Sequence, residues 1–424
     1  MSSDRLIVHH LDREVGTITR RISRQSTGSR TRPNSGPLMF EYADSWLTGG
    51  GFALATSLPL REGAWETAYF RNLLPEAGAR EWIARSAGIS SENDFAFLRL
   101  FGADCAGSLE ILDPDERPRT TAIGDVLLLR DEDGAKLATK SGFASYFHPE
   151  NRLRLSLAGA QNKLAVVQTE HGLAVPTGGQ PSTHILKLPN PDYKGLVENE
   201  AVMLSVAKAI GLPVVEHQVV TLGQTKLLLI ARYDRRVEDD AVLRLHQQDL
   251  CQVTGLPPDI KYESEGGPSL GTTFDLVREE VADPLSAARS LLDWVVFNVL
   301  VHNADAHAKN VSILRTGEDR QDLAPFYDLV CTGAYDLDPR LAMSVGGQFD
   351  PGAIEKKNWV RLAKDIGIGK SLVLRTVSEM ADRLPDVLDE ELTELQDRLG
   401  GFPRRQQLER TVKRRVRKTL ALLA

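Results

Sequence analysis

The stretch that most constrains the fold is residues 293–314, DWVVFNVLVHNADAHAKNVSIL. An apolar run of helical length ends at His302, a polar loop follows, and a second apolar run extends from Val311 to Leu314. A helix that is apolar on nearly all sides predicts a buried core element. We therefore expect the polar loop to be held in a fixed place between a core helix and a short strand.

This loop carries an acid and an amide at a spacing that has chemical meaning. Asp305 and Asn310 are five positions apart, as are the Asp and the metal-holding Asn of protein-kinase catalytic loops. Asp328 follows a short apolar run downstream, where a second metal-holding carboxylate would belong. Taken alone, the same spacing also fits an ordinary polar turn, because such turns favour Asp and Asn.

Length and composition indicate a soluble globular chain of two or three domains, since 424 residues exceed one ordinary core. The net charge of −7 argues against an autonomous nucleic-acid-binding protein. Three widely spaced cysteines form neither a disulfide framework nor a zinc pattern, which predicts a reducing cytoplasmic location. No stretch approaches the roughly 18 apolar residues of a membrane span, and no signal-peptide core begins the chain, so we expect no membrane association.

Two segments are rich in arginine. Residues 19–37 contain five Arg among Ser, Thr, Gly and Pro, which predicts a solvated loop or, alternatively, a contact with an anionic partner. Residues 404–424 carry eight Lys and Arg and predict a helix with a solvated basic face. Contact of this helix with DNA or an acidic surface is the alternative. Residues 370–399, before it, predict two amphipathic helices.

Candidate phosphate-binding residues lie in the strand-rich part, residues 121–235. Within residues 155–167, Ala158, Gly159 and Ala160 separate two apolar runs, and small residues let backbone N–H groups approach a phosphate closely. The segment lacks a Walker pattern, and an ordinary hairpin is the alternative.

Lys187 lies in an apolar strand and could pair with a phosphate or simply be solvated. Residues 198–210 follow as a helix that Gly211 ends. Its acidic first turn could brace Lys187 or only complement the helix dipole.

Taken in order, these segments resemble the HipA family of serine/threonine-kinase toxins. The matching stretches are SLPL, FRNLLPE, SLAGAQNKLAVV, THILKLP, VENEAVMLSVAKAIGLPV, RYDR, QQDLCQ, KYESEGGP, NADAHAKN and PFYDL. The resemblance covers nearly the whole chain and implies an α+β, bilobed kinase-like fold, with a mixed α/β N-terminal lobe and an all-α C-terminal lobe. The implied domains are an extra N-terminal subdomain, an ATP-binding N-lobe with a glycine-containing loop, and a helical C-lobe, at residues 1–115, 116–235 and 236–424.

The resemblance also implies roles for single residues. Asp305 resembles the catalytic Asp that orients or deprotonates the substrate hydroxyl, and Asn310 and Asp328 resemble Mg²⁺ ligands. Lys187 resembles the phosphate-binding Lys. The other residues expected to contact ATP are Ala158, Gly159, Ala160, Gln161, Arg232, Tyr233, Gln247, His307 and Lys309.

Ser156 resembles the family serine whose autophosphorylation ejects the glycine-containing loop and silences the kinase. A phosphoserine adds about −1.5 to −2 charges beside the triphosphate, which repels the folded loop. The chain also departs from the family pattern. Ala231 lies at the implied hinge with Arg232 and Tyr233, where relatives often carry Glu, so adenine contacts there are expected to use the backbone. Asn162 stands where an acid is frequent, and Ala306 where Gly is common.

The activity that the resemblance implies is a Mg²⁺·ATP-dependent protein kinase that phosphorylates an aminoacyl-tRNA synthetase and arrests growth. The implied partners are a HipB-like helix-turn-helix antitoxin dimer and, through it, operator DNA. Two alternatives stay open: a catalytically silent co-repressor that acts with its antitoxin, and a small-molecule kinase on the same fold. The presence of Asp305, Asn310 and Asp328 together with Lys187 favours an active enzyme.

Overall fold

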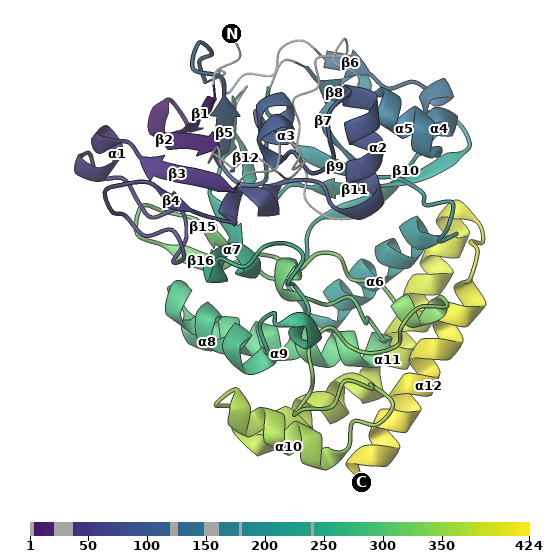
Figure 1. The fold of residues 1–424 in the computed structure, drawn as a ribbon. Coiled ribbons are helices and arrows are strands. Elements are labelled where there is room, and N and C mark those ends of the chain that lie inside the picture. Colours follow the sequence, from purple (N-terminus) through teal and green to yellow (C-terminus); the bar gives the residue numbers. More distant parts are fainter. Residues whose placement is uncertain (1–3, 21–36, 119–125, 148–160, 178–179, 239–240) are drawn as a thin grey trace, which may run out of the picture. The chain divides into compact units, whose positions relative to one another are not determined.

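A computed structural model describes residues 4–20, 37–118, 126–147, 161–177, 180–238 and 241–424 (Figure 1). The chain forms two compact units, and each is described by itself. Unit 1 consists of Met1–Leu188, Thr221–Thr225 and Ala231–Pro258, and unit 2 of Pro189–Val220, Lys226–Ile230 and Asp259–Ala424. The predicted domain boundaries after residues 115 and 235 stay a prediction.

Unit 1 begins with an antiparallel sheet whose strand order is β4-β3-β2-β1-β5. Its strands are β1 (Arg5–His10), β2 (Arg13–Arg20), β3 (Leu38–Tyr42), β4 (Trp65–Glu66) and β5 (Leu109–Leu112). Strands β1 and β2 form an antiparallel hairpin, with Arg5 opposite Thr19 and His10 opposite Arg13. Between β3 and β5 the chain forms α1 (Asp44–Thr48), the 3-10 helix η1 (Tyr69–Leu73), α2 (Ala77–Ala87) and α3 (Asp94–Phe101).

A second antiparallel group of strands in unit 1 has the order β9-β7-β8-β6. The strands are β6 (Val126–Leu128), β7 (Lys163–Thr169), β8 (Gly172–Pro176) and β9 (His184–Lys187). Two short helices that the sequence did not predict interrupt this strand-rich part, α4 (Asp131–Leu137) and α5 (Lys140–Ser145). Unit 1 ends with the hairpin β12 (Arg235–Glu238) and β13 (Ala241–Arg244), then β14 (Gln247–Asp249) and α7 (Leu250–Thr254).

Unit 2 is mainly helical, and it includes most of β10 (His217–Leu222) and of β11 (Thr225–Ala231), whose remaining residues belong to unit 1. Its longer helices are α6 (Leu196–Ile210), α8 (Leu270–Glu280), α9 (Pro284–Val301), α10 (Lys356–Asp365), α11 (Lys370–Leu399) and α12 (Arg405–Leu423). The helix predicted at residues 198–210 and the apolar helix predicted to end at His302 are confirmed. The expected all-α C-terminal lobe at residues 236–424 needs additions, because this range contains β13, β14 and the hairpin of β15 (Ser312–Arg315) and β16 (Gln321–Leu323).

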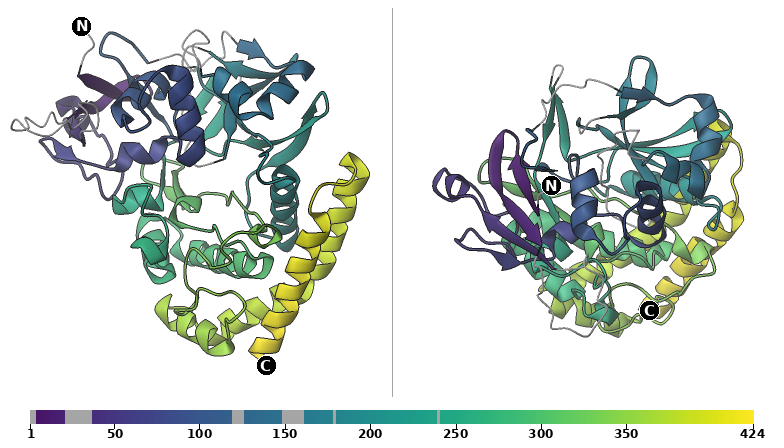
Figure 2. Two further views of the ribbon diagram at one scale, coloured as in Figure 1. Left: turned by 45° about the vertical axis from the view of Figure 1, so that its right-hand side comes forward. Right: turned by 45° about the horizontal axis from the view of Figure 1, so that its top comes forward.

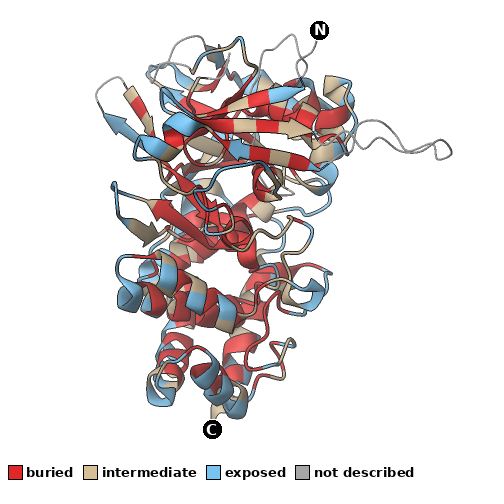
Figure 3. Ribbon diagram, turned by 60° about the vertical axis from the view of Figure 1, so that its left-hand side comes forward, coloured by how far each residue is buried: buried red, intermediate tan, exposed pale blue. Residues whose placement is uncertain are grey.

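Helix α9 is the core helix of unit 2. By length and composition alone it could cross a membrane, so the expectation that no stretch comes near this limit is wrong. The core of a protein selects the same apolar residues as a bilayer, and 67% of this helix is buried inside the protein. Buried residues run through the helices of unit 2 and the strands of unit 1, while exposed residues lie on their outer faces (Figure 3).

Helix α11 corrects the prediction of two helices in residues 370–399, because it is one helix of 30 residues with Pro385 inside it. Proline removes one backbone hydrogen bond at a cost of about 3 kcal/mol. Leu384, Leu388 and Leu392 nevertheless stay fully buried across this point, and each buried leucine contributes about 1.5–3 kcal/mol. The continuous apolar stripe therefore outweighs the break. Helices α11 and α12 lie side by side (Figures 1 and 2).

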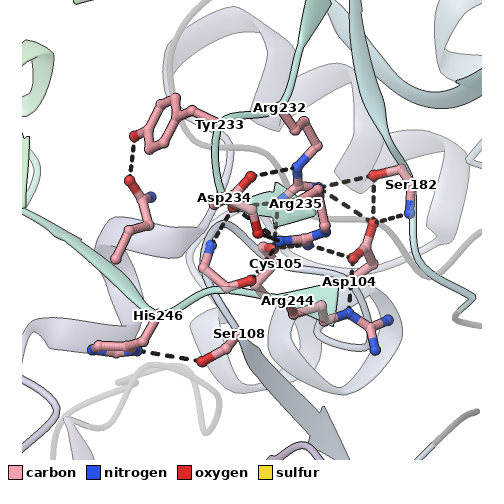
Figure 4. Close-up of polar contacts among 12 residues, drawn as sticks. Asp104, Cys105, Ser108, Ser182, Arg232, Tyr233, Asp234, Arg235, Arg244 and His246 are labelled. Carbon is pink, nitrogen blue, oxygen red and sulfur yellow. Dashed lines mark hydrogen bonds and ion pairs between the residues drawn. The ribbon is translucent and has the colours of Figure 1, made fainter. Parts of the chain in front are cut away.

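A cluster of buried charges joins distant segments of unit 1 (Figure 4). This buried charge cluster consists of Asp104, Arg232, Asp234, Arg235 and Arg244, whose side chains are at most 6% exposed. The Asp104 carboxylate accepts hydrogen bonds from Arg235 Nη2 at 2.7 Å, from Arg232 Nη1 at 3.3 Å and from the Ser182 hydroxyl at 2.6 Å. The Asp234 carboxylate accepts hydrogen bonds from Arg232 Nη2 at 2.7 Å and from the backbone N–H of Gly107 at 2.6 Å.

The buried charge cluster is close to neutral, because Arg244 also pairs with the buried Glu110 at 3.3 Å. Burial alone would raise the pKa of Asp104, but Arg235, Arg232 and Arg244 outweigh it and hold that pKa below its usual range. A group with a lowered pKa stabilises the fold above its unfolded-state pKa, and this contribution is lost as the pH falls.

We expect the substitution Asp104→Ala to destabilise the protein strongly. It would leave three buried arginines without their shared carboxylate, and breaking a buried ion pair costs about 3–5 kcal/mol. Urea and thermal unfolding of the full chain would measure the loss. Asp338→Ala is the matched control, since it removes an aspartate–arginine pair that is exposed to solvent. Equal small effects for both variants would contradict the assigned role.

Candidate active site

The loop after α9 is held at its start by a left-handed turn. His302 caps the helix at φ 56°, so the chain changes direction there. The Asn303 amide donates to Asn298 Oδ1 at 2.8 Å, and the Ala304 N–H donates to Thr332 Oγ1 at 2.7 Å. The loop therefore rests on side chains of the core helix and of a neighbouring segment, which fixes its position.

Asn310 and Asp328, the two predicted Mg²⁺ ligands, are brought together. Asn310 Nδ2 lies 3.3 Å from Asp328 Oδ2, and the Asn310 amide oxygen accepts the His307 N–H at 3.0 Å. Asp328 has φ 54°, a left-handed conformation that is uncommon outside glycine and clusters at functional sites. The carboxylate is thus turned toward the loop at a cost in backbone energy.

The donor set suits magnesium. Carboxylate and amide oxygens are the hard ligands that Mg²⁺ prefers, and in nucleotide sites one or two carboxylates combine with phosphate oxygens and water. The Asn310 oxygen has a second lone pair beyond the one that His307 uses. Among the residues that the structure describes, no group of three or more His, Cys, Asp or Glu forms a metal site by itself. A Mg²⁺ ion at Asn310 and Asp328 would therefore need further oxygens, from water or from phosphate groups.

Asp305 is the exposed carboxylate of this loop. Its side chain is 61% exposed, and its Oδ1 accepts a hydrogen bond from the Tyr262 hydroxyl at 2.5 Å. Its backbone N–H donates to Asn303 Oδ1 at 3.2 Å. An accessible carboxylate on a fixed backbone can accept a proton from a hydroxyl that approaches from solvent.

His307 and Lys309 are the buried members of the same loop. Burial, then the charge of Lys261, lowers the pKa of His307 well below its usual value, although Asp328 acts in the opposite direction. The imidazole is therefore neutral, and its Nε2 lies 3.7 Å from Asp305 Oδ1, too far for a hydrogen bond. The Lys309 carbonyl accepts the Tyr327 hydroxyl at 2.7 Å, which further holds the loop.

Lys187, the predicted phosphate-binding residue, ends β9 and is 3% exposed. It stands directly opposite Lys163 of β7 in the antiparallel register. Opposed residues point to the same face of a sheet, so the two amines leave the sheet together. Gln161 lies two positions before Lys163 in the sequence. Four further predicted residues lie outside the described residues, namely Ser156, Ala158, Gly159 and Ala160.

The expected nucleotide contacts Arg232, Tyr233 and Gln247 divide into two kinds. The Tyr233 hydroxyl donates to Gln247 Oε1, so these two expected nucleotide contacts meet in unit 1. Arg232 instead belongs to the buried charge cluster, where its guanidinium also donates to Ser182 Oγ at 2.8 Å and to the Cys105 carbonyl at 2.8 Å. The structure gives this side chain a structural role, and its contact with ATP stays a prediction.

Unit 1 thus holds Gln161, Lys187, Arg232, Tyr233 and Gln247, and unit 2 holds Asp305, His307, Lys309, Asn310 and Asp328. Sequence reasoning gave no role to Tyr262, which contacts both Asp305 and His307. The available signal was the stretch KYESEGGP, which belonged to the matching set without an assigned chemistry.

Comparisons with known proteins identify relatives of this chain. Two family models match the chain, the HipA N-terminal domain at residues 7–112 and the HipA-like C-terminal domain at residues 155–388. The chain is 37% identical over 386 residues to the putative kinase Y4mE of Sinorhizobium fredii, covering 87% of this chain and 90% of that one. It is 31% identical over 373 residues to the serine/threonine-protein kinase toxin HipA of Shewanella oneidensis, covering 82% and 83%.

A solved structure of the Shewanella oneidensis toxin–antitoxin system, a complex of HipA, HipB and operator DNA, matches the fold with a TM-score of 0.78. The match has 25% sequence identity and covers 98% of each chain. The α+β fold expected from the resemblance is thereby confirmed.

We expect the His307 imidazole to remain neutral at mildly acidic pH. Its lowered pKa means that the folded protein binds fewer protons than the unfolded chain below about pH 6.5, so protonation opposes folding there. Titration of the imidazole resonances by NMR from about pH 8 to about pH 5.5 would measure this, and His307→Gln would assign the signal. An inflection at the ordinary histidine value would contradict the burial of this ring.

Proposed function

The chain belongs to the HipA family, and from this premise we propose that it is a Mg²⁺·ATP-dependent serine/threonine-protein kinase that acts as a toxin. The observation that carries the proposal is the loop of unit 2. It presents the exposed carboxylate of Asp305 and, five positions later, the amide of Asn310 against the carboxylate of Asp328. This combination supplies both a proton acceptor and a pair of oxygen ligands for a cation, which a purely structural loop does not need.

The residues of the chain would share the work as follows. Asp305 would accept a hydrogen bond from the substrate hydroxyl, hold its oxygen in line and take its proton. Asn310 and Asp328 would hold Mg²⁺ through oxygen atoms, and Lys187 would pair with a phosphate. Bound Mg²⁺·ATP supplies the phosphoryl group, and the reaction then depends on positioning and charge neutralisation.

We further propose a protein substrate and two macromolecular partners. The substrate is an aminoacyl-tRNA synthetase, and the partner is a HipB-like antitoxin dimer that carries the complex to operator DNA in the cytoplasm. The Shewanella oneidensis relative, whose solved complex contains HipB and operator DNA, supports the antitoxin and the DNA. On α12, Arg414, Arg417 and Lys418 form an exposed basic face, while Arg415 is buried and contributes nothing to it.

The main alternative is a catalytically silent co-repressor. The presence of operator DNA in the related complex also fits this role. The two functions share partners and differ only in phosphoryl transfer. A kinase of small molecules is the third possibility, and the destination of the transferred phosphoryl group separates it from the first.

We expect the substitution Asp305→Asn to lower the rate of phosphoryl transfer from ATP by about 10²–10⁴-fold, because it removes the proton acceptor. Nucleotide binding should persist, since Asp305 is not among the proposed Mg²⁺ ligands. Labelled ATP incubated with the protein and a cell lysate would measure the transfer, with Asp338→Asn as an exposed control. Label in protein bands supports the protein kinase. Label only in small molecules supports the third possibility, and no label from ATP-binding protein supports the co-repressor.

We expect Ser156 to be the site of self-inactivation. Intact mass after incubation with Mg²⁺ and ATP should show one phosphoryl group on the parent protein and none on Ser156→Ala or Asp305→Asn. The phosphorylated form should bind ATP more weakly, because the added charge of about −1.5 to −2 repels the triphosphate. Equal ATP affinity of the two forms would disprove this mechanism.

A further inference from the structure

Tyr262 contacts the exposed carboxylate of the candidate active site from a separate segment of unit 2. Its hydroxyl donates to Asp305 Oδ1 at 2.5 Å, across 43 positions of sequence. A hydroxyl that donates to a carboxylate at such a distance forms a charge-assisted hydrogen bond, roughly twice as strong as a neutral one. Neither the resemblance to known kinases nor the spacing of the loop assigned a role to this tyrosine.

The ring of Tyr262 packs against His307 of the loop after α9. It meets the His307 imidazole edge to face, with ring centroids 5.3 Å apart and an interplanar angle of 88°. His307 is itself buried, and its backbone N–H donates to the Asp305 carbonyl at 3.0 Å and to Asn310 Oδ1 at 3.0 Å. The phenol, the imidazole and the loop backbone therefore form one connected arrangement.

The backbone on both sides of Tyr262 is also anchored. The Lys261 carbonyl accepts the Ala308 N–H at 3.4 Å, and the Glu263 N–H donates to the Ala342 carbonyl at 3.0 Å. The Glu263 carboxylate accepts the Ser344 N–H at 2.5 Å and its hydroxyl at 3.0 Å. Residues 261–263 thus bridge the loop and the segment around Ser344, and the phenol has a fixed direction.

The orientation of the Asp305 carboxylate depends on polar contacts, because 61% of its side chain is exposed and packing restricts it little. A general base must hold the reacting hydroxyl within a fraction of an ångström, because a misplacement of about 1 Å can cost 10²-fold in rate. A hydrogen bond from the Tyr262 hydroxyl to Oδ1 restricts the rotation of the carboxylate.

We propose that Tyr262 is a positioning residue for the phosphoryl transfer, orienting the Asp305 carboxylate through its phenol hydroxyl while His307 supports its ring. This inference rests on the proposed kinase function. Tyr262 acts through Asp305 and takes no proton itself.

The test is a comparison of Tyr262→Phe with the parent protein. Phenylalanine keeps the ring contact with His307 and removes only the hydroxyl. We expect kcat for transfer from ATP to fall about 10- to 100-fold. The KM for ATP and the affinity for a non-hydrolysable ATP analogue should change less than about twofold, because the phenol holds neither nucleotide nor metal. A purely structural role would instead lower stability and nucleotide affinity together.

Two further variants provide controls. Tyr335→Phe removes another tyrosine hydroxyl of unit 2, which donates to the Lys194 carbonyl at 3.5 Å, and should leave kcat unchanged. Tyr262→Leu removes both the hydroxyl and the ring contact and should lower kcat at least as far as Tyr262→Phe does. Thermal unfolding of each variant verifies that the fold is retained.

The outcomes separate this inference from the proposed function. A parent protein that binds ATP but transfers no phosphoryl group would refute the kinase function, and the inference with it. An active parent with unchanged kcat in Tyr262→Phe would refute the inference and leave the kinase standing. A higher kcat in Tyr262→Phe would also refute it, because the phenol would then occupy the place of the substrate hydroxyl.

Discussion

Burial of α9 is the constraint on which the candidate active site depends. The helix is the core of unit 2, and its left-handed end at His302 determines where the following loop leaves that core. Asn298, on the last turns of α9, then holds Asn303 of the loop through a buried side-chain hydrogen bond. The apolar side chains of α9 thus stabilise the helix in the core, and Asn298 near its end helps to fix the path of the following loop. A loop with Asp305 and Asn310 on a mobile element would have the same residues without the same geometry.

In unit 1, buried ion pairs hold the segment that carries Arg232 and Tyr233 in place. The buried charge cluster gathers Asp104, Asp234 and their arginines from segments far apart in sequence, and it includes Arg232 of the predicted hinge. A buried ion pair is weak evidence for net stability, but it penalises any arrangement in which one partner is missing. We therefore infer that the buried charge cluster holds the backbone around Tyr233 in one conformation, because Arg232, Asp234 and Arg235 flank this residue.

The loop after α9 places a neutral ring and charged groups in different surroundings. His307 is buried and its pKa is lowered, so its neutral ring packs without adding a charge beside Asn310 and Asp328, the proposed metal ligands. Asp305 is exposed and Asp328 is held in a left-handed conformation close to Asn310. The Asp305 carboxylate thus remains accessible to a hydroxyl, and the Asp328 carboxylate lies against the Asn310 amide. Tyr262 links the buried ring to the exposed acid by contacting both His307 and Asp305.

The sequence alone determined the local features: the core helix at residues 284–302, the spacing of Asp305 and Asn310, and the family. These depend on periodicity and on motif order, which a linear chain displays directly. Only the tertiary structure decided that Arg232 is bound inside a charge cluster, that α11 continues through Pro385, and that Tyr262 reaches Asp305. Such outcomes depend on burial and on partners distant in sequence. A local sequence pattern does not show which distant side chain will pair with a buried charge or donate a hydrogen bond to an exposed carboxylate.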